Sequence, residues 1–565
     1  MGAASLILPI LLPLLIVPLV LFPASRAMGL RLAPWAPLAG LMLALAAPAD
    51  PHLDPHLDLP GVLLGTSLGL DDTGRLFLLF TALVWLLAGW FAHGWLRDDA
   101  AKHRFWAFFL AAQAGNIGVC LAMDAASFYL LFALMSFAAY GLVVHGGTVE
   151  ALRAGRMYLS MAVLGEALLV AGILLAVGAA DSHRFAELAS TPLAGPAAAL
   201  LIAGFGIKVG VPLLHMWLPL AHPVAPVPAS AVLSGVMLKA GLLGWLRFLP
   251  LGAHAMPEAG TVLMGAGLAA MFLGVGAGLA QREPKVLLAY SSVSQMGFMT
   301  LGVGAGLAMP ALWPLLLPAV GLYALHHALA KSALFLGAGL IRLHGAHPAR
   351  LTALALPALA LAGAPLSSGM LAKTELKLAL AQLAAPWPDV LAWVLPLAAL
   401  GTALLMARLL WLLRDRYAAT APPAGSALAP NRPDIPWLLL VLASAGLAWA
   451  LAPQPLPQAL SPGTLLNAAW PPLAAATLGF IVLRLRWPAP KLPPGDVLVP
   501  MLRGLAFLRR LTPAALPQWR IALPVGSRAA ARSPQMEARL RAWGTAGALW
   551  LVLLAAVIAL LAGSA

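Results

Sequence analysis

The sequence predicts an all-α polytopic membrane protein. Of its 565 residues, 62% are hydrophobic and only 10% are Asp, Glu, Lys or Arg, whereas a soluble protein carries about 25% charged residues. Apolar runs recur from one end of the chain to the other, and each is long enough to cross a hydrocarbon core of roughly 30 Å. The 49 prolines and 53 glycines agree with this prediction, since membrane helices tolerate both.

Hydropathy predicts about sixteen transmembrane helices. The first apolar run has no basic region before it, and its nearest positive charges, Arg26 and Arg31, follow it. We therefore expect a retained helix and not a cleaved signal peptide. In chain order the predicted spans are 5–22, 29–47, 74–95, 103–123, 126–145, 155–179, 194–216, 228–249, 258–280, 286–305, 312–341, 351–372, 386–412, 436–452, 468–486 and 541–563.

The charges of the connections predict the orientation of the chain. Alternate connections, such as "SRAMGLR", "LRDDAAKHR" and "QREPK", carry Lys or Arg, and the connections between them, such as "MDAA" and "GLAMPALW", carry neither. Because positive loops stay on the cytoplasmic side, we expect both termini on the outer side of a bacterial inner (cytoplasmic) membrane.

The region before the last span is strongly basic. It carries eleven Lys and Arg against two acidic residues between Arg484 and Arg541, and nine prolines between 487 and 540. These prolines argue against one continuous helix. Short pieces such as "VPMLRGLAFLRRL" are amphipathic and favour contact with headgroups, and a flexible loop is the alternative. The position of this charge between spans favours a membrane or protein partner over nucleic acid.

Two predicted spans contain both a lysine and a helix-breaking proline. "FGIKVGVPLLHMWLPLAH" holds Lys208 and Pro212, and about 165 residues later "LAGAPLSSGMLAKTELK" holds Pro365 and Lys373. Paired broken helices are typical of transporters built from repeats. The chain thus divides into N-terminal helices (1–100), a first repeat broken near 208–212 (101–250), a second repeat broken near 365–373 (256–415), additional helices (416–487), the basic cytoplasmic segment (488–540) and a C-terminal helix (541–565).

A few ionisable side chains lie well inside the predicted spans. Each has an ordinary explanation: a lysine near a helix end reaches the interface, a residue pair at i, i+4 is a packing pair, and a lone buried acid stays neutral. Together, however, they suit proton movement, because a buried lysine loses its proton more readily and histidines relay protons. The candidate residues of this proton path are Glu166, Lys208, Lys239, His327, Lys331 and Lys373, with His326 beside them.

Several long motifs resemble one known family. "GIKVGVPLLHMWLPLAHPVAPVPASAVLSGVMLKAG", "EPKVLLAYSSVSQMGF", "HHALAKSALFLGAG" and "LAGAPLSSGMLAK" are similar to successive signatures of the antiporter-like membrane subunits of respiratory complex I, of Mrp cation/proton antiporters and of energy-converting hydrogenases. The similarity covers roughly residues 70–415. It implies a core of about fourteen helices with two inverted five-helix repeats, each with a broken helix, and a hydrated row of Lys, His and Glu that carries protons.

The sequence departs from the family pattern at two positions. The family has a glutamate that pairs with the first broken-helix lysine, and here "YLLFALMSFAAY" has Ala133 in its place. Four residues before His327, where many members have another histidine, this chain has Tyr323. We hypothesise that Glu166, one span later, takes over as the partner of Lys208.

The resemblance implies a proton-translocating subunit of a complex I-related assembly without an active site of its own. One alternative is a partner-dependent, proton-driven transporter for cation exchange or inorganic-carbon uptake. Another is a structural subunit whose conduction is impaired by Ala133. The expected partners are other membrane subunits, lipid, protons and Na⁺ or K⁺. With Cys120 as the only cysteine, we expect no iron–sulfur cluster, and we expect no other cofactor, metal or nucleic acid.

Overall fold

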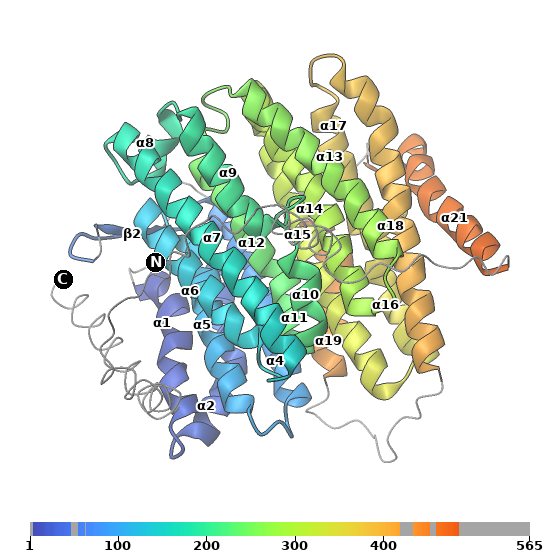
Figure 1. The fold of residues 1–565 in the computed structure, drawn as a ribbon, viewed down its shortest axis with the longest axis horizontal. Helices are drawn as coiled ribbons and strands as arrows, with labels where there is room; N and C mark the ends of the chain where they lie inside the picture. The colour runs from blue at the N-terminus through green and yellow to red at the C-terminus, as the bar shows by residue number, and fades with distance from the viewer. Residues whose placement is uncertain (1–3, 47–54, 63, 419–432, 453–458, 485–565) are drawn as a thin grey trace, which may run out of the picture.

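The computed structural model describes residues 4–46, 55–62, 64–418, 433–452 and 459–484, and its helices form one bundle (Figure 1). In the described ranges, ten helices are long and apolar enough to cross a bilayer, and shorter apolar helices pack beside them. Where the structure describes them, the predicted spans from 5–22 to 468–486 fall on helices, and several of them cover two or three consecutive helical elements. The predicted segment 488–540 and the span 541–563 lie outside the described residues.

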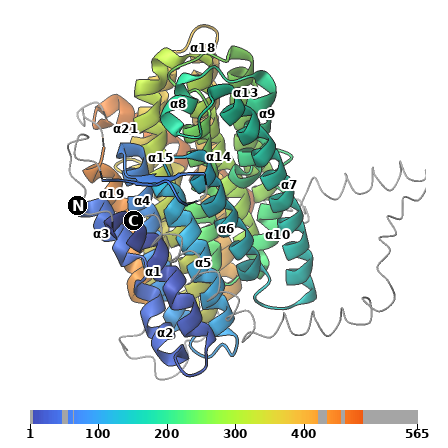
Figure 2. The same ribbon diagram turned by 90° about the vertical axis from the view of Figure 1, so that its left-hand side faces the viewer.

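The first half of the bundle runs from α1 to α12. Its helices stand side by side, with α7 at one edge of the molecule (Figure 2). Its elements are α1 (Ala4–Leu21), α2 (Arg26–Leu32), η1 (Ala33–Trp35), α3 (Leu38–Ala46), β1 (His56–Leu59), β2 (Thr66–Gly69), α4 (Asp72–Trp95), α5 (Lys102–Leu121), α6 (Ala125–Val143), α7 (Val149–Ala180), α8 (Phe185–Ser190), α9 (Gly195–Val209), α10 (Trp217–Val224), α11 (Val227–Val232), η3 (Leu233–Met237) and α12 (Leu238–Phe248).

The second half begins with two closely packed helices and ends at α21, which lies at the right-hand edge in Figure 1. Helices α14 and α15 are buried along most of their length. The elements of this half are α13 (Pro257–Leu279), α14 (Pro284–Ala308), η4 (Pro310–Leu312), α15 (Trp313–His344), α16 (Pro348–Ala362), α17 (Ser368–Leu380), α18 (Trp387–Tyr417), α19 (Asp434–Ala450) and α21 (Pro462–Arg484).

A short β-hairpin is the one departure from an all-α chain in the described ranges, and it falls in the connection between the predicted spans 29–47 and 74–95. Strands β1 and β2 pair antiparallel, with His56 opposite Gly69 and Leu59 opposite Thr66. The hairpin is fixed to the bundle because the backbone N–H of Ser67 donates to the Asp124 carboxylate at 2.8 Å. Asp124 also caps the N-terminus of α6, so one side chain joins the hairpin to a transmembrane helix.

The first broken helix ends at Val209 and resumes at Trp217. Gly210 and Leu213 have positive φ angles of 84° and 71°, a conformation that favours glycine and ends a helix. The freed carbonyl groups need partners because hydrocarbon supplies none. The Trp217 indole donates to the carbonyl oxygen of Ile207 at 2.8 Å and supplies one.

The second broken helix has the same form but a different cap. Helix α16 ends before Gly363, whose φ is 83°, and α17 begins after Leu366, whose φ is 62°. The Lys373 amine donates to the carbonyl oxygens of Leu361 and Ala362 at 2.9 and 3.0 Å. The lysine of the second repeat therefore caps its own helix break.

Glycines set the close approach of α13 to α14. A Cβ atom at Gly267 would lie 2.7 Å from the carbonyl oxygen of Gly297, and one at Gly274 would lie 2.6 Å from backbone atoms of Tyr290 and Ser294. Both contacts are with backbone, which cannot move aside, so small residues are required here. Gly276, on the same helix, has open space around it.

We expect Gly267→Ala to destabilise the protein and Gly276→Ala to leave it unchanged. The added methyl group at Gly267 forces the two helices apart, and overpacking of this kind costs about 1–3 kcal/mol. Thermal unfolding of the two variants in detergent, followed by the loss of monodisperse protein, measures the difference. Equal midpoints would contradict the packing described above.

Candidate functional site: a row of buried lysines

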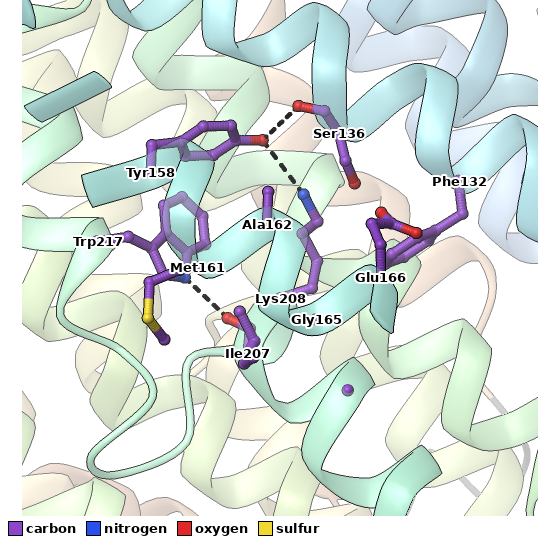
Figure 3. Close-up of a pocket in the computed structure, with 11 residues that line it drawn as sticks. Phe132, Ser136, Tyr158, Met161, Ala162, Gly165, Glu166, Ile207, Lys208 and Trp217 are labelled. Atoms are coloured by element: carbon purple, nitrogen blue, oxygen red, sulfur yellow. Dashed lines mark hydrogen bonds between the residues drawn. The ribbon is translucent and has the colours of Figure 1, made fainter. Parts of the chain in front are cut away.

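Lys208 lies in a small cavity at the first helix break. This first-break cavity has a volume of about 20 Å³ and is lined by α6, α7, α9 and α10. Such a space holds one water molecule. Figure 3 shows the Lys208 amine turned toward the Tyr158 hydroxyl group, and Glu166 and Ser136 line the same cavity.

The amine of Lys208 is held by a hydroxyl group and by aromatic rings. It donates to the Tyr158 hydroxyl oxygen at 3.3 Å, and Tyr158 in turn donates to the carbonyl oxygen of Ser136 at 2.8 Å. The ring centroids of Phe132, Tyr158 and Trp217 lie 5.5, 5.5 and 5.8 Å from the amine nitrogen. A desolvated cation–π contact contributes about 2 kcal/mol, which is comparable to the insertion cost of about 2.5–3.5 kcal/mol for a lysine at the membrane centre.

Glu166 reaches the first-break cavity from α7 but makes no direct ion pair with Lys208. Its Oε2 atom is buried and has no hydrogen-bond partner among the described residues. One water molecule in the cavity has room to bridge the carboxylate and the amine. Ala133 is not among the residues that line this cavity, although its neighbour Phe132 is.

Lys239 and Lys331 form the centre of the row. Both are fully buried. The alternative that Lys239 extends to the membrane–water interface therefore does not apply. Lys239 donates to the carbonyl oxygen of Ser234 at 2.8 Å, and Lys331 donates to the Leu288 carbonyl oxygen at 2.8 Å and the Ser291 hydroxyl oxygen at 2.6 Å. All of these partners are neutral.

Serines join the two central lysines. The hydroxyl groups of Ser234 and Ser292 are 2.7 Å apart, and Ser292 donates to the same Leu288 carbonyl oxygen that Lys331 uses. Ser234 belongs to the π-helical turn η3, a feature often found at functional sites. The serine hydroxyl groups both donate and accept, whereas the carbonyl oxygens that the two amines use at the ends of this hydrogen-bond chain only accept.

The two adjacent histidines of α15 have different surroundings. His326 Nδ1 lies 2.9 Å from the Ser368 hydroxyl oxygen at the start of α17, so this histidine contacts the second break. His327, the residue predicted for the proton path, is fully buried, and neither of its ring nitrogens has a hydrogen-bond partner among the described residues.

Sequence reasoning missed several polar groups near the row. Lys285 was counted among the charges of the cytoplasmic loop "QREPK", but it is buried in the first turn of α14 and donates to the carbonyl oxygen of Ala225 at 2.5 Å. Its place directly after Pro284, a residue that often begins helices, was the available signal. Tyr158, Ser136 and Trp217 gave no signal, because aromatic residues and serine are common in membrane helices.

The fold and the row define a class: a polytopic helical membrane protein with two broken helices and buried lysines. Residues 122–395 match the family described as NADH:quinone oxidoreductase/Mrp antiporter, transmembrane. The resemblance drawn from the sequence motifs is thus confirmed over residues 122–395.

Individual relatives agree with this family. Hydrogenase-4 component B of Escherichia coli (strain K12) is 30% identical over 294 residues, which are 49% of this chain and 44% of that protein. A subunit of the Na⁺/H⁺ antiporter of Alkalihalophilus pseudofirmus is 27% identical over 400 residues, 66% of this chain and 80% of that one. This chain therefore spans less than half the length of the first relative and four fifths of the second.

A solved structure shows the same fold. A chain of the Mrp complex from Dietzia sp. DQ12-45-1b superposes with a TM-score of 0.69 at 21% identity, covering 98% of this chain and 62% of that chain. Identity this low shows the architecture alone, and it supports the multi-pass helical fold described above.

We expect Glu166→Gln to lower coupled proton movement about as much as Lys208→Ala, at least tenfold. The hypothesis that Glu166 is the partner of Lys208 requires a group that exchanges protons, and the amide cannot take one up. The measurement is dye-reported acidification of vesicles that contain the complete complex. Glu150→Gln, an exposed acid in the first turn of the same helix, is the matched control. Proton movement at the wild-type rate in Glu166→Gln would contradict the hypothesis that Glu166 is the partner of Lys208.

Proposed function

We propose that the chain is a proton-conducting, antiporter-like membrane subunit of a multi-subunit complex. Protons pass along the row of Glu166, Lys208, Lys239, His327, Lys331 and Lys373. The central observation is that Lys239 and Lys331 are fully buried and held by neutral oxygens only. A structural role does not require an ionisable group at such a position, since the group is costly there.

The arrangement supports stepwise movement of charge. Each central amine has carbonyl or hydroxyl acceptors that stabilise its protonated form, and hydrogen bonds to a charged group contribute about 1.5–3 kcal/mol each. This is of the same size as the insertion cost, so these acceptors offset the cost of burying the charged amine. A change of charge at Lys208 or Lys373 then shifts the balance between the charged and the neutral form.

The relatives support the assembly and the ions of this proposal. They are named as a hydrogenase component and as part of an Na⁺/H⁺ antiporter, so we propose that this chain works beside other membrane subunits and that protons, with Na⁺ as exchange ion, are its cargo. Glu166 takes over the role of the family glutamate, whose position is occupied by Ala133 in this chain. The charge pattern of the loops supports a bacterial cytoplasmic membrane with both termini outside.

Lys331→Ala should lower proton movement by the complete complex at least tenfold, because it removes the proton-binding group at the centre of the row. Dye-reported acidification of vesicles measures this effect. Lys102→Gln, a lysine at the start of α5 that donates to the Arg97 carbonyl oxygen, is the control and should leave the rate unchanged. If Lys331→Ala assembles normally and pumps at the wild-type rate, the row does not carry the protons.

The orientation is testable with single cysteines. Cys120 is buried, so introduced thiols report alone. Gly195→Cys, at the first residue of α9, should react with a membrane-impermeant maleimide on intact cells, and Gly146→Cys, between α6 and α7, should react only after lysis. Both glycines have open space around them, so neither change disturbs packing. The reverse labelling pattern would place the termini in the cytoplasm.

A further inference from the structure

A second and larger cavity lies beside the second helix break. This second-break cavity has a volume of about 320 Å³ and is lined mainly by α17, α18 and α21, with Phe298 of α14 also in its wall. It thus lies toward the edge of the molecule marked by α21 on the right of Figure 1. Its size is within the range of about 300–1,000 Å³ that is usual for small-molecule sites.

The charged groups of this cavity are all positive. Lys373 and Lys377, one helical turn apart, both line it, and none of its described lining residues is an Asp or Glu. Lys373 donates two hydrogen bonds to the carbonyl oxygens of the break, so one of its three donors remains for another partner. Like charges at i, i+4 destabilise a helix, and an anion between them removes this repulsion.

Most of the wall is apolar. Five of the eighteen lining residues are polar: the two lysines, Thr374, Thr464 and Asn467. A free hydrated anion gains little in such a space, because its water shell is lost against apolar atoms. An amphiphile, with an anionic group at the lysines and hydrocarbon along the rest of the wall, satisfies both parts.

The rim of the cavity faces the lipid. Leu378 and Trp470 line it and are 45% and 38% exposed, and Leu473 on the next turn of α21 is 66% exposed. In a bilayer this rim contacts acyl chains, and tryptophan is typical of the interfacial region. A ligand therefore reaches the cavity from within the membrane.

We propose that the second-break cavity binds an anionic phospholipid. The phosphate group lies between Lys373 and Lys377, and an acyl chain follows Leu395 and Trp470. On the cytoplasmic side of membranes, basic pockets between transmembrane helices bind anionic headgroups, and the paired lysines offer the same chemistry here. The lipid charge lies beside the last lysine of the row, so lipid composition affects the electrostatics of the second break.

The test is lipid retention by the purified complete complex. After delipidation, phosphatidylglycerol or phosphatidylcholine is titrated, and bound lipid is counted by native mass spectrometry. We expect phosphatidylglycerol to bind about tenfold more tightly than phosphatidylcholine. Lys377→Gln should weaken the binding of phosphatidylglycerol about tenfold, because one charge-assisted contact is lost. Lys102→Gln, which removes the same charge elsewhere, should bind as the wild type does.

A second variant leaves the charges in place. Leu395→Trp fills the apolar part of the cavity and should also reduce phosphatidylglycerol retention, which gives an answer if Lys377→Gln fails to assemble. Equal binding of both lipids, unchanged binding in Lys377→Gln, or displacement of the lipid by millimolar inorganic phosphate would overturn the proposal. Lipid is counted without any measurement of proton movement, so this result stands or falls separately from the proposed function.

Discussion

The structure depends on how three lysine amines are accommodated inside the membrane without a carboxylate as hydrogen-bond partner. The amines of Lys239, Lys331 and Lys373 are all satisfied by backbone carbonyl oxygens. In a regular helix these oxygens are occupied by the backbone itself. The break before α17 frees the acceptors of Lys373, and the acceptor of Lys239 belongs to the π-helical turn η3. The acceptor of Lys331 lies inside the regular helix α14. At Lys239 and Lys373 the irregular backbone and the buried lysine thus support each other.

The two repeats solve this problem in different ways. In the first, the lysine precedes the break, Trp217 caps the freed carbonyl group, and aromatic rings surround the Lys208 amine. In the second, the lysine follows the break and is itself the cap. Loss of the proton from Lys373 thus weakens the hydrogen bonding of its own helix end, whereas loss of the proton from Lys208 leaves the first break capped. The repeats are alike in backbone form and unlike in how protonation and structure are coupled.

The fold was largely predictable, because the bilayer imposes span length and satisfied backbone groups, and both leave a clear record in hydropathy and in proline and glycine positions. The β-hairpin was missed, and the side chain that fixes it to the bundle, Asp124, comes from far away in the chain. The lysines of the site were predictable as single residues. Their partners were not, since carbonyl oxygens such as that of Leu288 are identical at every position of a sequence. Lys285 was assigned to a loop because a charge close to a helix end cannot be placed in depth from composition alone.

The shared carbonyl oxygen of Leu288 has a further consequence for how such a site changes in evolution. It accepts from both Lys331 and Ser292, and any L-amino acid at position 288 presents the same atom. Substitution of the side chain cannot remove this junction, and only a change in helix geometry can. This backbone acceptor is thus protected against point mutation, whereas the Ser291 hydroxyl acceptor and the lysine donors are exposed to it.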